Sequence, residues 1–159
     1  MLIINMLMKR DLTNRFAFLV NDVARLYGRH FDQLAREQIG LSRAQCRLLV
    51  VLAMQEGPLS QAGLAERLDL SAMGVGGLCD RMEATGWIRR QPSGSDRRVN
   101  EVHLEPRAEQ ALDAALALSD TIHAAAMDGL GGAERIQLMA LLRRAHANLV
   151  AMSGEGAAP

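Results

Sequence analysis

The sequence predicts a mainly α-helical (α+β) protein that carries one small β-hairpin. Hydrophobic residues make up 49% of the 159 residues but aromatic residues only 3%, so the core must be built from Leu, Ala, Val, Ile and Met, which favours helices. The apolar residues recur mainly at intervals of three and four, whereas two short stretches, 87–90 and 99–104, alternate like strands. These two stretches flank a turn rich in Pro, Ser and Gly. The length suits one domain, or one compact domain with helical extensions.

Two helices are predicted in the N-terminal third of the chain. The first covers 12–37, and Gly40 ends it. Ser42 and Gln45 then form a capping box at the start of a second helix. This second helix is apolar nearly all round until the Gly-Pro pair at 57–58, so we expect it to be central and buried.

The following segment, 59–104, predicts two short helices joined by a tight turn and then the hairpin. Ser60 caps a helix over 61–68, and Ser71 caps a helix that ends at Gly86, where a residue without Cβ fits a left-handed backbone. This order is typical of a winged helix-turn-helix, which lays its second helix in a DNA major groove and its hairpin in an adjacent groove. The apolar residues expected to seal the two helices together are Ala65, Leu68, Leu70, Val75, Leu78 and Met82.

Two more helices are predicted beyond the hairpin. The first starts at Pro106 and runs to about Gly129, and the last covers 133–152. Together with the N-terminal helix they would expose a large apolar patch if unpaired, so we infer that they pack on the same elements of a second copy. The alternative is that they fold back on their own chain. The predicted organisation is a helical dimerisation region at 10–40 and 106–152, a winged helix-turn-helix DNA-binding domain at 41–105 and a disordered tail at 153–159.

An ordered set of residues runs through the winged segment. They are Leu41-Ser42-x-x-Gln45, Leu64-Ala65, Leu68, Ser71, Asp80-Arg81-Met82-Glu83, Gly86-Trp87, Arg90, Asp96-Arg97-Arg98-Val99 and Leu104. This set resembles the MarR family of bacterial transcription regulators. The resemblance implies a homodimer that binds a palindromic operator in double-stranded DNA, and a repressor released by a small-molecule effector, often an aromatic acid. A two-fold dimer would place the centres of its half-sites about 34–36 Å apart.

The hairpin carries the leading candidates for DNA contacts. A guanidinium at Arg98 can enter the narrow, electronegative minor groove, and Asp96 can fork onto it, as the matching residues do in the family. Arg97, Arg89 and Arg90 are interpreted as phosphate contacts, which set register without reading sequence, although Arg89 or Arg90 can instead face the sheet. The formal net charge is zero, but residues 86–98 hold four Arg against one acid. The alternative is an ordinary solvated hairpin.

The second helix of the winged segment offers few side chains to DNA. The positions expected to face it are Ser71, Ala72, Met73, Gly74, Gly76, Gly77 and Arg81. The family usually carries a small hydroxyl residue at 74 and an Arg at 77, and this chain has Gly at both. We therefore expect sequence reading to rest on the hairpin, on Ser71 and Arg81, and on DNA shape. The opposite interpretation is weak or lost DNA binding, with the winged-helix dimer serving as a ligand- or protein-binding module.

The remaining candidates lie outside that helix. Ser42, Arg43 and Arg47 lie at the start of a helix whose N-terminus can take a phosphate, and simple capping explains them equally well. Phe16, Tyr27 and Cys46 are candidates for the effector site that the resemblance implies, although core packing also explains each of them.

Other classes of site and function have little support in the sequence. Cys46 and Cys79 are interpreted as core cysteines of a reducing compartment, and the four His are scattered, so no metal or cofactor is expected. There is no nucleophile–base pair, phosphate loop or cluster of carboxylates, so we do not expect an enzyme. The apolar stretch 1–8 is too short to span a bilayer and no cleavage site follows it, which predicts a cytoplasmic protein without a membrane partner.

Overall fold

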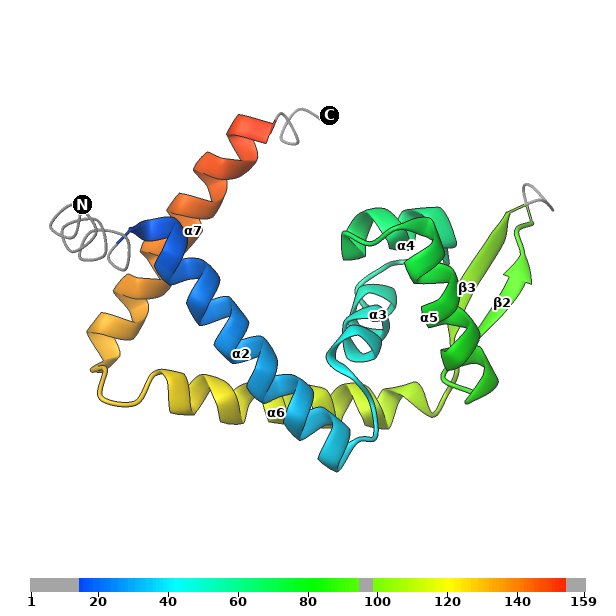
Figure 1. Ribbon diagram of the computed structural model, residues 1–159, viewed down its shortest axis with the longest axis horizontal. Coiled ribbons are helices and arrows are strands. Elements are labelled where there is room, and N and C mark those ends of the chain that lie inside the picture. Colours follow the sequence, from blue (N-terminus) through cyan, green and yellow to red (C-terminus); the bar gives the residue numbers. More distant parts are fainter. Residues whose placement is uncertain (1–14, 95–98, 154–159) are drawn as a thin grey trace, which may run out of the picture. The chain divides into compact units, whose positions relative to one another are not determined.

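The computed structural model describes residues 15–94 and 99–153 (Figure 1). Six helices and one three-stranded antiparallel sheet make up this part of the chain, which confirms the mainly α class. The helices are α2 (Phe16–Gln38), α3 (Arg43–Ala53), α4 (Gln61–Leu68), α5 (Ala72–Ala84), α6 (Ala108–Ala126) and α7 (Gly132–Ser153). The strands are β1 (Leu59–Ser60), β2 (Ile88–Pro92) and β3 (Asn100–Leu104). The chain divides into two compact units, one up to Ile122 and one from His123. Apart from Ser153, the predicted disordered tail lies outside the described residues.

Local capping chemistry sets the helix starts in the winged unit. Ser42 and Gln45 form the predicted capping box, because the Gln45 amide donates to Ser42 Oγ at 3.3 Å and the Ser42 amide donates to Gln45 Oε1 at 2.8 Å. Ser60 and Ser71 cap α4 and α5 through their hydroxyl oxygens, each of which accepts from the amide three residues on at 3.1 Å. Gly86 follows α5 with φ +72°, the left-handed backbone expected there.

The core of the winged unit lies where α3, α4 and α5 meet the sheet. The prediction is confirmed for Leu68, Val75, Leu78 and Met82, which are at most 4% exposed, and Ala65 packs against them. It is wrong for Leu70, whose side chain is 41% exposed. The preceding residue, Asp69, takes a left-handed backbone with φ 53°, and the chain after it leaves the apolar face of α4. Leu64 fills the core from α4 instead and is fully buried.

The sheet has one more strand than the predicted hairpin. Strand order is β1-β3-β2, and β1 pairs with β3 through Leu59 opposite Val102. In the hairpin itself β2 pairs with β3 from Ile88 opposite Leu104 to Pro92 opposite Asn100. A two-residue strand is too short to show an alternating pattern, so β1 leaves no signal in the sequence.

Two helices differ from their predicted character. Helix α3 is buried on one side through Cys46, Leu48, Leu49 and Leu52, whereas Met54 at its C-terminal end is 77% exposed, so the helix is not buried all round. Helix α6 begins at Ala108, and Pro106 lies in the turn before it.

Two helices carry exposed apolar side chains along one face or more. Helix α2 exposes Phe16, Phe18, Leu19, Val20, Val23 and Leu26, each at least 39% accessible. In α7 no position whose side chain is described is buried, and Ile136, Leu141, Leu149 and Met152 are more than half exposed. Among the described helices, none is both long and apolar enough to cross a bilayer.

Candidate nucleic-acid interface

The N-terminal half of α5 is anchored on one side and open on the other. The helix is anchored in the core by four buried side chains, those of Val75, Leu78, Cys79 and Met82. On the open side lie the predicted positions Ser71, Ala72, Met73 and Gly74, all exposed, with Gly76 and Gly77 half-buried behind them. The side chain of Met73 is 88% exposed, more than that of any other exposed large hydrophobic residue that the structure describes.

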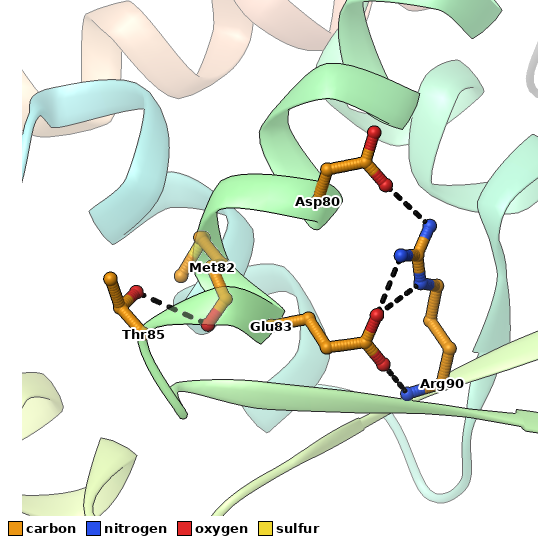
Figure 2. Close-up of polar contacts among 5 residues, drawn as sticks. All are labelled: Asp80, Met82, Glu83, Thr85 and Arg90. Carbon is orange, nitrogen blue, oxygen red and sulfur yellow. Dashed lines mark hydrogen bonds and ion pairs between the residues drawn. The ribbon is translucent and has the colours of Figure 1, made fainter.

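Arg81 reaches back along the same helix. A Cβ built on Gly77 would lie 3.5 Å from Arg81 Nη1, which is ordinary van der Waals contact. The guanidinium therefore lies next to the surface that a side chain at 77 would occupy. One turn further, the hydroxyl of Thr85 donates to the carbonyl oxygens of Arg81 and Met82 and closes the C-terminal end of α5. Figure 2 shows the contact with Met82.

The two arginines of β2 have separate partners. Arg89 Nη1 lies 3.1 Å from Glu105 Oε1, just beyond β3, and its side chain is 45% exposed. Arg90 binds two carboxylates of α5, those of Glu83 and Asp80 (Figure 2). Successive side chains of a strand point to opposite faces, which explains why neighbouring arginines reach different elements.

Both charges of the Arg90–Glu83 pair are reinforced by their contact. Hydrogen bonds from the Arg90 side chain and amide hold the pKa of Glu83 below its ordinary value. The same side-chain contact raises the pKa of Arg90. The pair is therefore ionised at neutral pH.

The start of α3 is occupied by the protein's own groups. Asp32 Oδ1 accepts from the Arg43 amide at 2.7 Å, and Asp32 Oδ2 accepts from Arg36 Nε at 2.8 Å. Both hydrogen bonds hold the pKa of Asp32 below its ordinary value, and the bond from the Arg36 side chain has the larger effect. The Arg43 guanidinium lies against Gly28 of α2, where any Cβ would overlap it. A phosphate at this helix N-terminus would have to displace Asp32.

A pocket of about 340 Å³ lies among α2, α3 and α6. Two of the three residues predicted for an effector site, Tyr27 and Cys46, line it, and the Tyr27 and Ser119 hydroxyls are 2.6 Å apart at its edge. Phe16 does not line it, and its side chain is 55% exposed at the start of α2. The lining also includes Arg43 and Arg47, which were not predicted to belong to an effector site. The one hint was Gly28, because a glycine inside a long helix is typical of a close approach by another group.

Both cysteines are buried, which confirms their predicted core position. Burial raises the pKa of the Cys46 thiol to about 11, and burial likewise raises the pKa of the Cys79 thiol. Within the described ranges, no three His, Cys, Asp or Glu side chains are grouped so that they could hold a metal ion.

Residues 39–99, which include α3, α4, α5 and the strands β1 and β2, match the model of the MarR family. This winged-helix unit belongs to the MarR family. Reduced MarR from E. coli superposes with a TM-score of 0.76 at 19% identity, over 82% of this chain and 96% of that chain. MepR from S. aureus in complex with DNA has a TM-score of 0.68 at 21% identity, over 85% and 96% of the two chains. BpsR from Bordetella bronchiseptica, whose DNA binding is regulated by 6-hydroxynicotinic acid, has a TM-score of 0.70 at 22% identity, over 84% and 94%. At these identities the likeness establishes the fold.

The open side of α5 carries few polar side chains. Gly74 and Gly77 provide no side-chain donors, and only Ser71 and Arg81 put polar side chains on or beside the exposed N-terminal half. The predicted DNA-contacting residues of the hairpin tip, Asp96, Arg97 and Arg98, lie outside the described residues, so their roles stay predictions.

Proposed function

We propose that this chain is a homodimeric, sequence-specific DNA-binding transcription regulator that acts in the cytoplasm. The observation that carries the proposal is the open N-terminal half of α5, a helix whose C-terminal half is bound to the hairpin through Arg90. In a winged helix-turn-helix this part of the second helix enters the major groove. The DNA complex of MepR, which shares the fold over 85% of this chain, supports the same role here. In addition to the exposed part of α5, the proposed contacts are Arg81, Arg89 and the hairpin-tip residues Asp96, Arg97 and Arg98.

The uncovered apolar faces of α2 and α7 support dimerisation. Soluble monomers rarely expose contiguous apolar patches of this kind, and a second copy of the same helices would cover them. We therefore assign 10–40 and 106–152 to a helical dimerisation region, and 41–105 to DNA binding. A two-fold axis between the copies would match a palindromic operator.

The pocket beside Tyr27 supports control by a small effector. Its lining combines apolar side chains with the cations of Arg43 and Arg47, a combination suited to an aromatic acid. BpsR, which responds to 6-hydroxynicotinic acid, supports an effector of this class. Because α2 belongs to the proposed dimer region and α3 to the winged unit, a ligand between them can favour one spacing of the two DNA-binding units. If ligand binding releases the protein from DNA, the protein is a repressor. The ligand can shift the equilibrium between the two spacings by no more than its difference in binding free energy for them.

The test is binding to a labelled duplex from the region upstream of the chain's own gene, followed across salt concentrations. A regulator that neutralises several phosphates should lose affinity steeply, with a slope of about −0.9 in log K per log salt for each phosphate. Arg98→Ala should weaken binding, because it removes the guanidinium proposed to enter the minor groove. Light scattering of the free protein should give twice the chain mass.

A second candidate is a winged-helix dimer that no longer binds DNA and serves as a ligand- or protein-binding module. The glycines of the exposed α5 surface favour it, because they remove donors that base edges require. Binding that is absent at low salt, or independent of salt, would favour this module and would count against the regulator.

A further inference from the structure

We infer that Asp80, Glu83 and Arg90 form a clamp that fixes the angle between α5 and the hairpin, and that this angle is required for DNA binding. The inference rests on the proposed function, because it concerns how two DNA-binding elements are held together. None of the three residues needs to touch DNA in this role, so all three are positioning residues.

The clamp joins β2 to α5 through the main chain as well as the side chains. The Arg90 amide donates to Glu83 Oε1 at 2.7 Å, while Arg90 Nε and Nη2 donate to Glu83 Oε2 at 2.8 and 2.6 Å (Figure 2). Arg90 Nη1 lies 2.8 Å from Asp80 Oδ1. One carboxylate thus holds both the backbone and the guanidinium of the same residue, which restricts rotation and sliding of the strand more than a single ion pair would.

The sheet makes this attachment necessary. Strand β2 lies at the edge of the β1-β3-β2 order, so amides on its outer side have no neighbouring strand. Arg90 is the middle residue of the five in β2, opposite Val102, and its amide points to Glu83 on α5. The helix therefore takes the place of a further strand at this point of the hairpin.

The electrostatics of α5 also match a cation delivered from the hairpin. Asp80 and Glu83 lie in the C-terminal part of the helix, where the unpaired carbonyl groups disfavour negative charge. Arg90 is the cation bound to both carboxylates. If Arg90 were removed, two acids would remain at the helix end without their common partner.

The geometry assigns Arg90 a different role from the phosphate contact predicted from the sequence. Its Nε, Nη1 and Nη2 atoms are all engaged by carboxylates, and its side chain is only 25% exposed. The two acids are partly exposed, Glu83 at 34% and Asp80 at 65%. Partly exposed ion pairs contribute little to folding stability, so the clamp should affect orientation more than unfolding.

The experiment compares Glu83→Ala, Arg90→Ala and the double variant. The probe is a fluorescent 30-base-pair duplex that the wild-type chain has selected from a random library. Each single variant should bind roughly tenfold more weakly, and the double variant should lose no more than either single one because all three break the same linkage. Glu83→Gln, which keeps the shape of the side chain, should be affected in the same direction. Glu105→Gln is the matched control, since it breaks the ion pair of the neighbouring Arg89 without touching α5.

The outcomes separate the clamp from the alternatives. If Glu83→Ala binds as well as wild type or better, Arg90 serves as a phosphate contact and the clamp is overturned. Affinities are measured well below the melting temperature of each variant. If the loss of DNA affinity is fully explained by the fraction of unfolded protein in each variant, the clamp is also overturned. If the effects of the single variants add, Glu83 and Arg90 act independently, and the clamp again fails. If the wild-type chain selects no duplex at low salt, the proposed function itself fails.

Discussion

Replacing Gly76 by Ala should make the folded protein more stable, although the residue lies in the proposed DNA-binding helix. Gly76 is the fifth residue of α5, which begins at Ala72 and ends at Ala84, so it lies in the helix interior. A Cβ built on it meets no atom within 4 Å beyond its chain neighbours and the nearby backbone of its own helix, so the added methyl group requires no rearrangement. The fold itself therefore gives no reason for a glycine at this position.

The expected gain follows from helix propensity alone. Glycine in a helix interior costs about 1 kcal/mol relative to alanine, chiefly because its unfolded backbone is more flexible. A gain of about 1 kcal/mol corresponds to a rise of roughly 2–4 °C in Tm for a chain of this length. No change in the core accompanies it, so the dependence of unfolding free energy on urea should keep the wild-type slope.

Two other glycines act as controls in thermal and urea unfolding. Gly77→Ala should stabilise to a similar extent, because its Cβ makes only ordinary contact with Arg81 Nη1 at 3.5 Å. Gly86→Ala should destabilise by roughly 1–2 kcal/mol, because φ +72° at that position is unfavourable for a residue with a Cβ.

An unchanged or lower Tm for Gly76→Ala, together with the expected loss for Gly86→Ala, would refute the reasoning. It would mean that position 76 is either not helical in the free protein or covered by another part of the assembly.

Three further predictions concern the core, the clamp and the thiols. Leu49→Ala, at a fully buried position of α3, should lower the unfolding free energy by about 2–5 kcal/mol in urea titrations, and a loss below 1 kcal/mol would contradict its place in the core. The carboxylate of Glu83 has a pKa below its ordinary value of 4.5, so its stabilising effect is complete above that pH and is lost as the pH falls through the lowered value. The difference in unfolding free energy between wild type and Glu83→Gln should therefore shrink on acidification from about pH 7 to about pH 3. Cys46 and Cys79 should react slowly with a disulfide reagent in the native protein and rapidly in denaturant, because both are buried and their thiol pKa values are raised; fast native reaction would exclude the core position.

Local chemistry made much of the fold predictable from the sequence. The caps at Ser42, Ser60 and Ser71 and the left-handed glycine at Gly86 depend on residues within three or four positions, so their partners can be found by reading along the chain. Helical spacing likewise identified most of the core of the winged unit. The motif residues around these caps predicted the family, which the match over 39–99 confirms.

The candidate site was less predictable, because its side chains choose partners that are distant in sequence. The sequence could show that Arg89 and Arg90 belong to a hairpin strand, but not that Arg90 would bind Glu83 and Asp80 while Arg89 binds Glu105. Arg43 was interpreted as a helix-start cation, whereas its guanidinium lies on Gly28 and beside the pocket.

For this protein, the sequence by itself determined the serine caps that start α3, α4 and α5, most of the predicted residues of the helix-turn-helix core, and the family of the winged unit. Only the tertiary structure decided that Leu70 is exposed, that β1 joins the sheet, that a pocket forms beside Tyr27, and that Arg90 is held by α5. The physical reason is the distance along the sequence over which the interactions act. Caps and helical periodicity act between neighbouring residues, whereas these four features depend on which elements pack together, and long flexible side chains such as arginine can reach several partners.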